Sequence, residues 1–134
     1  MLKISLFLRR WGLALLMMAA IFGFSSIPSS GMPDFGLLDL IVKKGGHALG
    51  YGLLALAYLY GLKGDEKNIV PRWLFAAWVM AVLFSTTDEF HQSFVPGRHP
   101  AATDVLIDSL GAAAALAIAY LYYKQKRPAP QADR

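Results

Sequence analysis

The sequence of 134 residues contains no cysteine, and only 16% of its residues are charged, against about a quarter in a typical soluble domain. The absence of cysteine excludes a disulfide-stapled secreted domain and any metal site built on thiolates. Because 56% of the residues are hydrophobic, a soluble fold of this size would have too few polar side chains to cover its apolar surface. The composition therefore indicates a membrane protein.

The sequence also lacks a clustered basic face and any alternation of polar and apolar residues. Its net charge is +4, but the basic residues are dispersed along the chain, which excludes a nucleic-acid partner. The absence of two-residue alternation disfavours a membrane barrel. No motif predicts a cofactor, and no compact metal-binding signature such as His-Glu-x-x-His occurs.

Four apolar runs approach the roughly 20 helical residues that cross a hydrocarbon core about 30 Å thick. We predict helices at about 11–27, 45–62, 72–90 and 104–123. The predicted fold is all-α, a polytopic membrane protein with four transmembrane helices in a single domain over 1–134. The residues at 124–134 are predicted to form a flexible cytoplasmic tail.

The basic residues predict the orientation of these helices. If the N-terminus is cytoplasmic, ten of the 13 lysines and arginines face the cytoplasm, and only Lys43, Lys44 and Arg98 lie outside. Cytoplasmic loops of membrane proteins carry the excess of Lys and Arg. We therefore expect both termini to be cytoplasmic.

The second predicted helix carries polar side chains at its outer end. Lys43, His47 and Tyr51 recur every four residues and so share one helix face, with Lys44 beside it. A histidine one turn into an apolar helix is often structural, but its place between a lysine pair and a tyrosine favours a functional role.

The third predicted helix ends with a comparable polar face. Asp88, His91 and Gln92 stand on one side of it, and Glu89 lies on the adjoining side. On the same outer side, Ser25 closes the first helix, and its hydroxyl is as well explained by capping as by contact with a ligand.

The fourth predicted helix begins with two carboxylates one turn apart, Asp104 and Asp108. The helix dipole explains Asp104 but reaches Asp108 less well. An ionisable residue at membrane depth usually faces a polar cavity or a partner. Arg98, on a Pro-Gly turn before this helix, adds a cation to the same side.

Several functions fit this cluster. In an enzyme, Glu89 and His47 would act as general acid and base, while Arg98 and Lys44 would clamp a phosphate of an envelope lipid. A binding or shielding module would recognise such a ligand without converting it. A transporter is the weakest interpretation, because the cytoplasmic half offers no polar lining.

A structural alternative is that the charges only hold the helices together. Against it, small residues can join membrane helices without charge pairs, and the sequence supplies Gly45, Gly46, Gly50 and Gly111 for that purpose.

These polar residues resemble the VanZ-like family over about residues 11–123, with Phe24-Ser25-Ser26 fitting as well. Three segments carry the resemblance: Lys44-x2-His47-x3-Tyr51, then Asp88-Glu89-Phe90-His91-Gln92-Ser93-Phe94-Val95-Pro96-Gly97-Arg98, then, five residues later, Asp104-Val105-Leu106-Ile107-Asp108-Ser109-Leu110-Gly111. Relatives often carry Asn at the position of Asp108, so its role need not be that of an anion.

The resemblance implies a small multi-pass protein of the bacterial cytoplasmic membrane. The family is named for a protein that raises resistance to teicoplanin-type glycopeptides, so the implied partners are membrane lipids and an anionic lipid-linked envelope precursor or a glycopeptide. The family's polar residues fall here on Lys44, His47, Tyr51, Glu89, Gln92, Arg98 and Asp104. The oligomeric state is left open.

Overall fold

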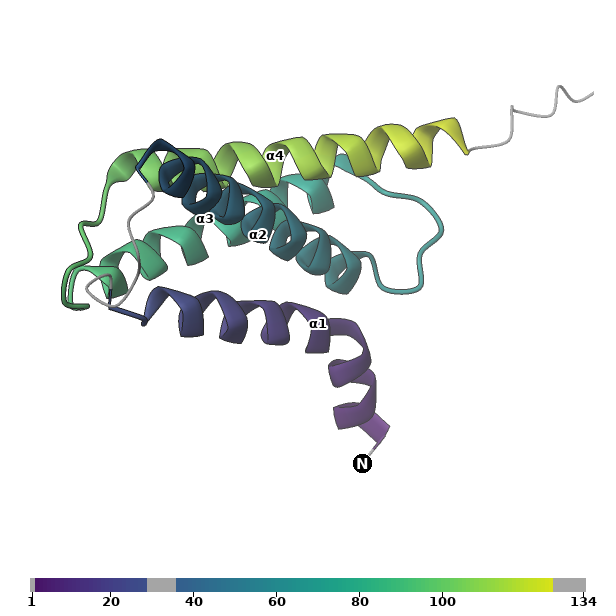
Figure 1. The fold of residues 1–134 in the computed structure, drawn as a ribbon. Coiled ribbons are helices and arrows are strands. Elements are labelled where there is room, and N and C mark those ends of the chain that lie inside the picture. The colour runs from purple at the N-terminus through teal and green to yellow at the C-terminus, as the bar shows by residue number, and fades with distance from the viewer. Residues whose placement is uncertain (1, 29–35, 127–134) are drawn as a thin grey trace, which may run out of the picture.

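Three of the four predicted apolar runs lie within helices in the computed structural model, which describes residues 2–28 and 36–126, and the first run extends two residues past the end of its helix. In chain order the helices are α1 (Leu2–Ser25), α2 (Leu37–Lys63), α3 (Pro71–Gln92) and α4 (Ala102–Gln125) (Figure 1). These described ranges contain no strand, so the predicted all-α class is confirmed.

The helices are longer than the predicted apolar runs. α1 begins at Leu2 rather than near residue 11, and α2 begins at Leu37 rather than near residue 45. Uncharged runs mark where a helix is apolar, whereas helical hydrogen bonding continues through lysines and arginines, which are good helix formers. α4 continues to Gln125 and so includes the first two residues of the predicted tail, whereas residues 127–134 lie outside the described part.

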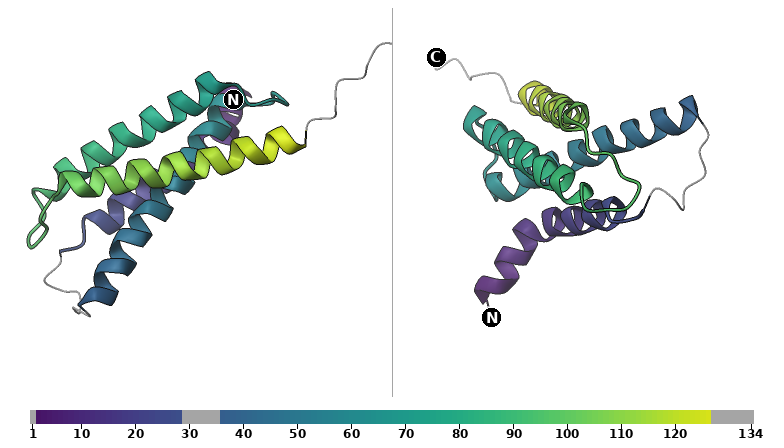
Figure 2. Two further views of the ribbon diagram at one scale, coloured as in Figure 1. Left: turned by 90° about the horizontal axis from the view of Figure 1, so that it is seen from above. Right: turned by 90° about the vertical axis from the view of Figure 1, so that its left-hand side faces the viewer.

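α2 is the central helix of the bundle. It supplies half of the buried core residues, including Tyr51, Leu54 and Tyr58, and the other three helices pack around it (Figure 2). At the far end from the polar cluster, the indole ring of Trp11 occupies the space beside Gly61, 2.8 Å from where a Cβ would stand. This contact joins the first half of α1 to the end of α2.

α2 and α4 approach most closely at a glycine. A Cβ on Gly111 would overlap the backbone carbonyl of Ala48, and it would lie 2.8 Å from the Cα of Ala48. Of the glycines expected to join helices, Gly111 therefore does so, whereas a Cβ on Gly45 or Gly46 would meet no atom within 4 Å. Gly52, one turn along from Ala48, completes the crossing.

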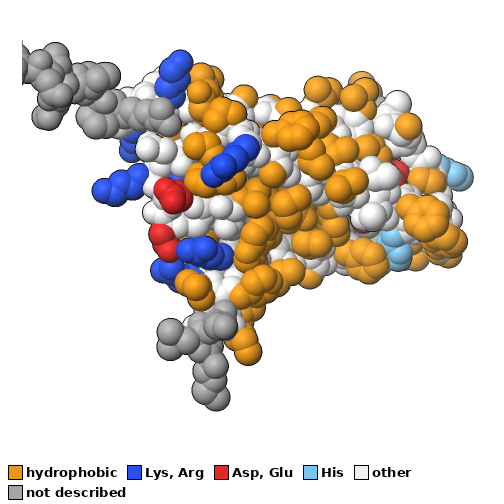
Figure 3. Space-filling view, turned by 180° about the vertical axis from the view of Figure 1, so that it is seen from behind, with side chains coloured by type: hydrophobic (Ala, Val, Ile, Leu, Met, Phe, Trp, Pro, Cys, Tyr) orange, Lys and Arg blue, Asp and Glu red, His pale blue; other side chains and the backbone are white. Residues whose placement is uncertain are grey.

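The outer surface of the bundle is strongly apolar. Figure 3 shows hydrophobic side chains across the middle, lysines and arginines toward one end, and histidines at the other. Every helix contributes large exposed hydrophobic residues, among them Leu16, Leu49, Phe75 and Ile118. Among the described residues, two helical segments are long and apolar enough to cross a membrane, Ile4–Ser25 and Ala102–Gln125.

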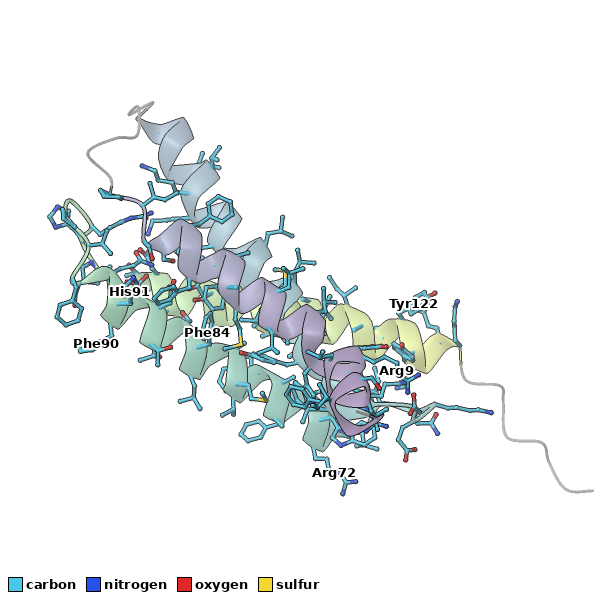
Figure 4. The ribbon with its side chains drawn as sticks, turned by 90° about the horizontal axis from the view of Figure 1, so that it is seen from below. Arg9, Arg72, Phe84, Phe90, His91 and Tyr122 are labelled. Atoms are coloured by element: carbon cyan, nitrogen blue, oxygen red, sulfur yellow. The ribbon has the colours of Figure 1, made fainter. Side chains whose placement is uncertain are left out.

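The basic end of the bundle is joined by ion pairs. Asp65, in the connection between α2 and α3, contacts Arg9 at 3.2 Å and Arg10 at 2.9 Å. The hydrogen bond from Arg10, together with the charge of Arg9, holds the pKa of Asp65 below its ordinary value. Because these side chains are exposed, the pairs contribute little stability. Arg9 and Arg72 lie at this end, opposite His91 and Phe90 (Figure 4).

Candidate functional site

Two contacts link α2 to α4 at the polar end. The Nζ of Lys44 donates a hydrogen bond of 2.6 Å to Oδ1 of Asp104, and Nδ1 of His47 lies 3.5 Å from Oδ1 of Asp108. The three-residue spacing on α2 matches the four-residue spacing on α4, so the two pairs stand side by side. The helix faces predicted for these four residues therefore meet.

Asp108 is the most buried member of the cluster, with a side chain only 1% exposed. Its Oδ2 accepts a hydrogen bond of 2.7 Å from the hydroxyl of Ser85, which is fully buried in α3. Sequence reasoning did not select Ser85. The signal that would have found it is its spacing, because Ser85, Asp88 and Gln92 recur at three- and four-residue intervals on one face of α3.

A second network joins α1 to α3. The hydroxyl of Ser25 donates to Oδ2 of Asp88 at 2.7 Å, and Nε2 of Gln92 donates to the same oxygen at 3.1 Å. Beside it, Nε2 of His91 lies 3.1 Å from the hydroxyl of Ser26. Asp88, His91 and Gln92 thus share a face, as predicted, and this face is turned toward the end of α1.

Arg98 closes the end of α1. Its Nε donates to the carbonyl of Ile27 and its Nη2 to the carbonyl of Phe24, both at 3.1 Å. Carbonyls at a helix C-terminus lack helical partners, and a cation there also complements the helix dipole. Gly97, with φ of 76°, forms the turn that brings the guanidinium into place. Lys44 and Arg98, expected to clamp one phosphate together, are thus engaged with different partners.

Glu89 faces the connection that leads into α4. Its Oε2 accepts a hydrogen bond of 3.0 Å from the backbone N–H of Ala101, the residue before the first turn of α4. No hydrogen bond joins Glu89 to His47 among the described residues, and the carboxylate next to His47 is that of Asp108. The acid–base pairing of Glu89 with His47 remains a prediction.

Several buried polar atoms of this cluster have no hydrogen-bond partner within the described part of the chain. They are the hydroxyl of Tyr51, Oδ1 of Asp88 and Oε1 of Glu89, together with Nδ1 of His47 and Oδ1 of Asp108, which face each other at 3.5 Å without a hydrogen bond. Buried polar groups are normally satisfied, and each unsatisfied one costs roughly 1–3 kcal/mol. Because these atoms are concentrated at one end of the bundle, that end is where packing of the helices leaves buried polar groups without hydrogen bonds.

A cavity of about 520 Å³ opens beside this cluster, between α1 and α2. Its lining includes apolar side chains, among them Met17, Ile21 and Val42. It also includes five side chains with polar atoms: Ser25, Lys43, His47, Tyr51 and Arg98. The volume falls within the range of small-molecule sites.

The structure therefore divides the predicted site residues by position. His47, Tyr51 and Arg98 line the cavity, whereas Lys44, Asp88, Gln92, His91, Glu89, Asp104 and Asp108 do not. The buried carboxylates contact lining residues instead, Asp88 through Ser25 and Asp108 beside His47. Ser25, which sequence reasoning left open between a cap and a ligand contact, lines the cavity and binds a carboxylate. Among the described residues, no group of three or more His, Asp and Glu side chains converges as a metal site would require.

A bundle with an apolar exterior, charges at both ends and a polar cluster at one end defines a small helical protein of the membrane type. Residues 3–123 match the model of the VanZ/LLP1 family, so the chain belongs to that family, and the resemblance seen in the sequence is confirmed. No curated protein and no solved structure matches the chain.

Proposed function

We propose that this protein spans the bacterial cytoplasmic membrane four times and binds an anionic cell-envelope ligand at its outer end. The proposal is carried by the cavity between α1 and α2, whose polar wall holds cationic and hydrogen-bond-donating groups. Both termini would be cytoplasmic, on the side that carries Arg9, Arg10 and Arg72.

The exposed surface supports spanning by all four helices. The 22 residues of α3 extend about 33 Å at 1.5 Å per residue, which exceeds the roughly 30 Å hydrocarbon core. The side chains of Leu49 on α2 and Phe75 on α3 are 65% and 66% exposed. Monomeric soluble proteins rarely expose apolar surface on every side, whereas lipid contacts it without cost.

The finer proposal is that this binding contributes to resistance against teicoplanin-type glycopeptides. Its test compares cells that carry the wild type with cells that carry Glu89→Gln, at matched protein levels in the membrane. We expect the wild type to reduce labelling by a fluorescent lipoglycopeptide, and the variant to lose most of that reduction. A simple glycopeptide without an acyl chain is the control. Equal labelling in both strains would remove the antibiotic link for this chain.

A catalytic role is the second candidate, and one observation favours it. His47 lies beside a buried carboxylate that Ser85 orients, which is how enzymes position an imidazole for acid–base work. Turnover of a phosphorylated envelope lipid by purified protein, lost in His47→Gln but retained in Lys67→Gln, would establish it. Binding without turnover would leave the site as a recognition module.

The structural alternative makes a different prediction for the pair of Lys44 and Asp104. If the pair only holds α2 against α4, Lys44→Asp and Asp104→Lys should each lower the level of folded protein, and the double swap should restore both level and function. If Lys44 also serves the ligand, the double swap should restore the level while function stays low. The readouts are membrane protein level by immunoblot and the lipoglycopeptide labelling described above.

A further inference from the structure

We propose that the cavity between α1 and α2 takes the apolar chain of an anionic amphiphile drawn from the bilayer, with its head beside Arg98 and His47. The inference rests on the proposed function and specifies its ligand as a single chain joined to an anionic head. It follows from the lining of the cavity, which combines apolar side chains with the donors of His47 and Arg98.

The apolar part of the cavity matches a hydrocarbon chain. Met17, Ala20, Ile21 and Val42 line it, and none of them offers a polar side-chain atom. Gly46 lines the same space, and a Cβ built there would meet no atom within 4 Å. An apolar chain can therefore run past this glycine between the two helices.

The polar part of the cavity matches an anion or another hydrogen-bond acceptor. Arg98 carries five N–H donors, and its Nε and Nη2 contact carbonyls of α1 while the side chain also borders the cavity. Tyr51 also lines the cavity, whereas its hydroxyl is buried close to Asp88 and Ser85. No carboxylate belongs to the described lining.

Two buried carboxylates, Asp88 and Asp108, hold polar side chains of the cavity lining in place. Asp88 accepts from Ser25 at 2.7 Å, and Asp108 lies 3.5 Å from Nδ1 of His47, so two lining side chains are each backed by an anion. Asp88 and Asp108 are themselves 2% and 1% exposed and do not reach the cavity. They are positioning residues for this ligand, and the groups that touch it are the lining side chains.

The test measures lipid binding to the purified full-length protein by native mass spectrometry in detergent. The probes are lysophosphatidylglycerol, which has one chain and an anionic head; lysophosphatidylcholine, which has the same chain and a zwitterionic head; and glycerol phosphate, which has no chain. We expect wild type to bind lysophosphatidylglycerol about tenfold more tightly than lysophosphatidylcholine, as one charge-assisted hydrogen bond would give, and not to retain glycerol phosphate.

Two neighbouring glycines supply the decisive variants. Gly46→Leu places a side chain in the cavity and should weaken binding of both lysolipids about tenfold or more. Gly45→Leu is the matched control, because its Cβ is equally unobstructed but Gly45 does not line the cavity, and it should bind as wild type does. Thermal unfolding followed by circular dichroism verifies that both variants fold.

Each result bears on a separate claim. If Gly46→Leu and Gly45→Leu bind alike, or if glycerol phosphate binds as well as the lysolipid, the chain site is overturned. In that case a loss of head-group preference in Arg98→Gln would still support the proposed anionic ligand. If wild type shows no preference between the two lysolipids and Arg98→Gln changes nothing, the proposed function fails together with the chain site.

Discussion

Replacing Gly111 with alanine should lower the free energy of unfolding by about 1–3 kcal/mol, the usual cost of forcing one extra carbon into a packed contact. The added Cβ would overlap the backbone of Ala48, which cannot rotate away as a side chain could. The two helices must then separate, and the contacts of Lys44 with Asp104 and of His47 with Asp108 lie close to this crossing. We therefore expect stability and ligand binding to fall together.

The control for this substitution is Gly23→Ala in α1. A Cβ at Gly23 would meet no atom within 4 Å, and alanine is the better helix former by about 1 kcal/mol in water. Thermal unfolding in detergent should show Gly111→Ala below wild type and Gly23→Ala at or above it. If the two variants unfold at the same temperature, the close crossing of α2 and α4 does not limit stability.

Asp108→Ala should be the most damaging substitution within the polar cluster. It would leave the buried hydroxyl of Ser85 without its acceptor, at a cost of about 1–3 kcal/mol, and it would also remove the carboxylate beside His47. Asp108→Asn keeps an oxygen that can accept from Ser85 and nearly the same volume. We expect this variant to stay within about 1 kcal/mol of wild type in unfolding experiments.

A double-mutant cycle separates these two contributions. If the hydrogen bond from Ser85 is what Asp108 provides, Ser85→Ala should cost little more once Asp108 has already been replaced by alanine. Full additivity of the two substitutions would show that the contact between Ser85 and Asp108 contributes nothing to stability. A large loss of ligand binding in Asp108→Asn, with stability retained, would assign the negative charge to the positioning of His47.

The sequence alone predicts the helices well, because each is an apolar run separated from the next by charges or turn residues. It does not predict where α1 and α2 begin, since Arg9 and Arg10 in α1, and Lys43 and Lys44 in α2, interrupt the apolar pattern without interrupting the helix. A stretch without charged residues indicates that a segment lies in apolar surroundings. The backbone hydrogen bonds of a helix, however, form in polar surroundings as well, so the helix continues past that stretch.

The site is predictable in its members and less so in its pairings. Helix periodicity places His47 with Lys44 and Asp108 with Asp104, but it does not say which faces of different helices meet. Which faces meet depends on how α2 is rotated relative to α4, and the close backbone contact of Gly111 with Ala48 fixes that rotation. The role of Ser85 is not predictable, because a single serine among apolar residues is usually a packing residue. The partners of Arg98 are not predictable either, because they are backbone carbonyls, which every residue has.

The way α1 is attached has a consequence for how fast a ligand can exchange. Its outer end is held by Ser25 and Arg98 and its first half by Arg10 and Trp11, while the turns between these two attachments border the cavity. We expect entry to proceed by outward bowing of these turns rather than by release of either attachment. Amide protons around Met17 should then exchange with solvent deuterium sooner than those of the central helix, and a bound ligand should slow them.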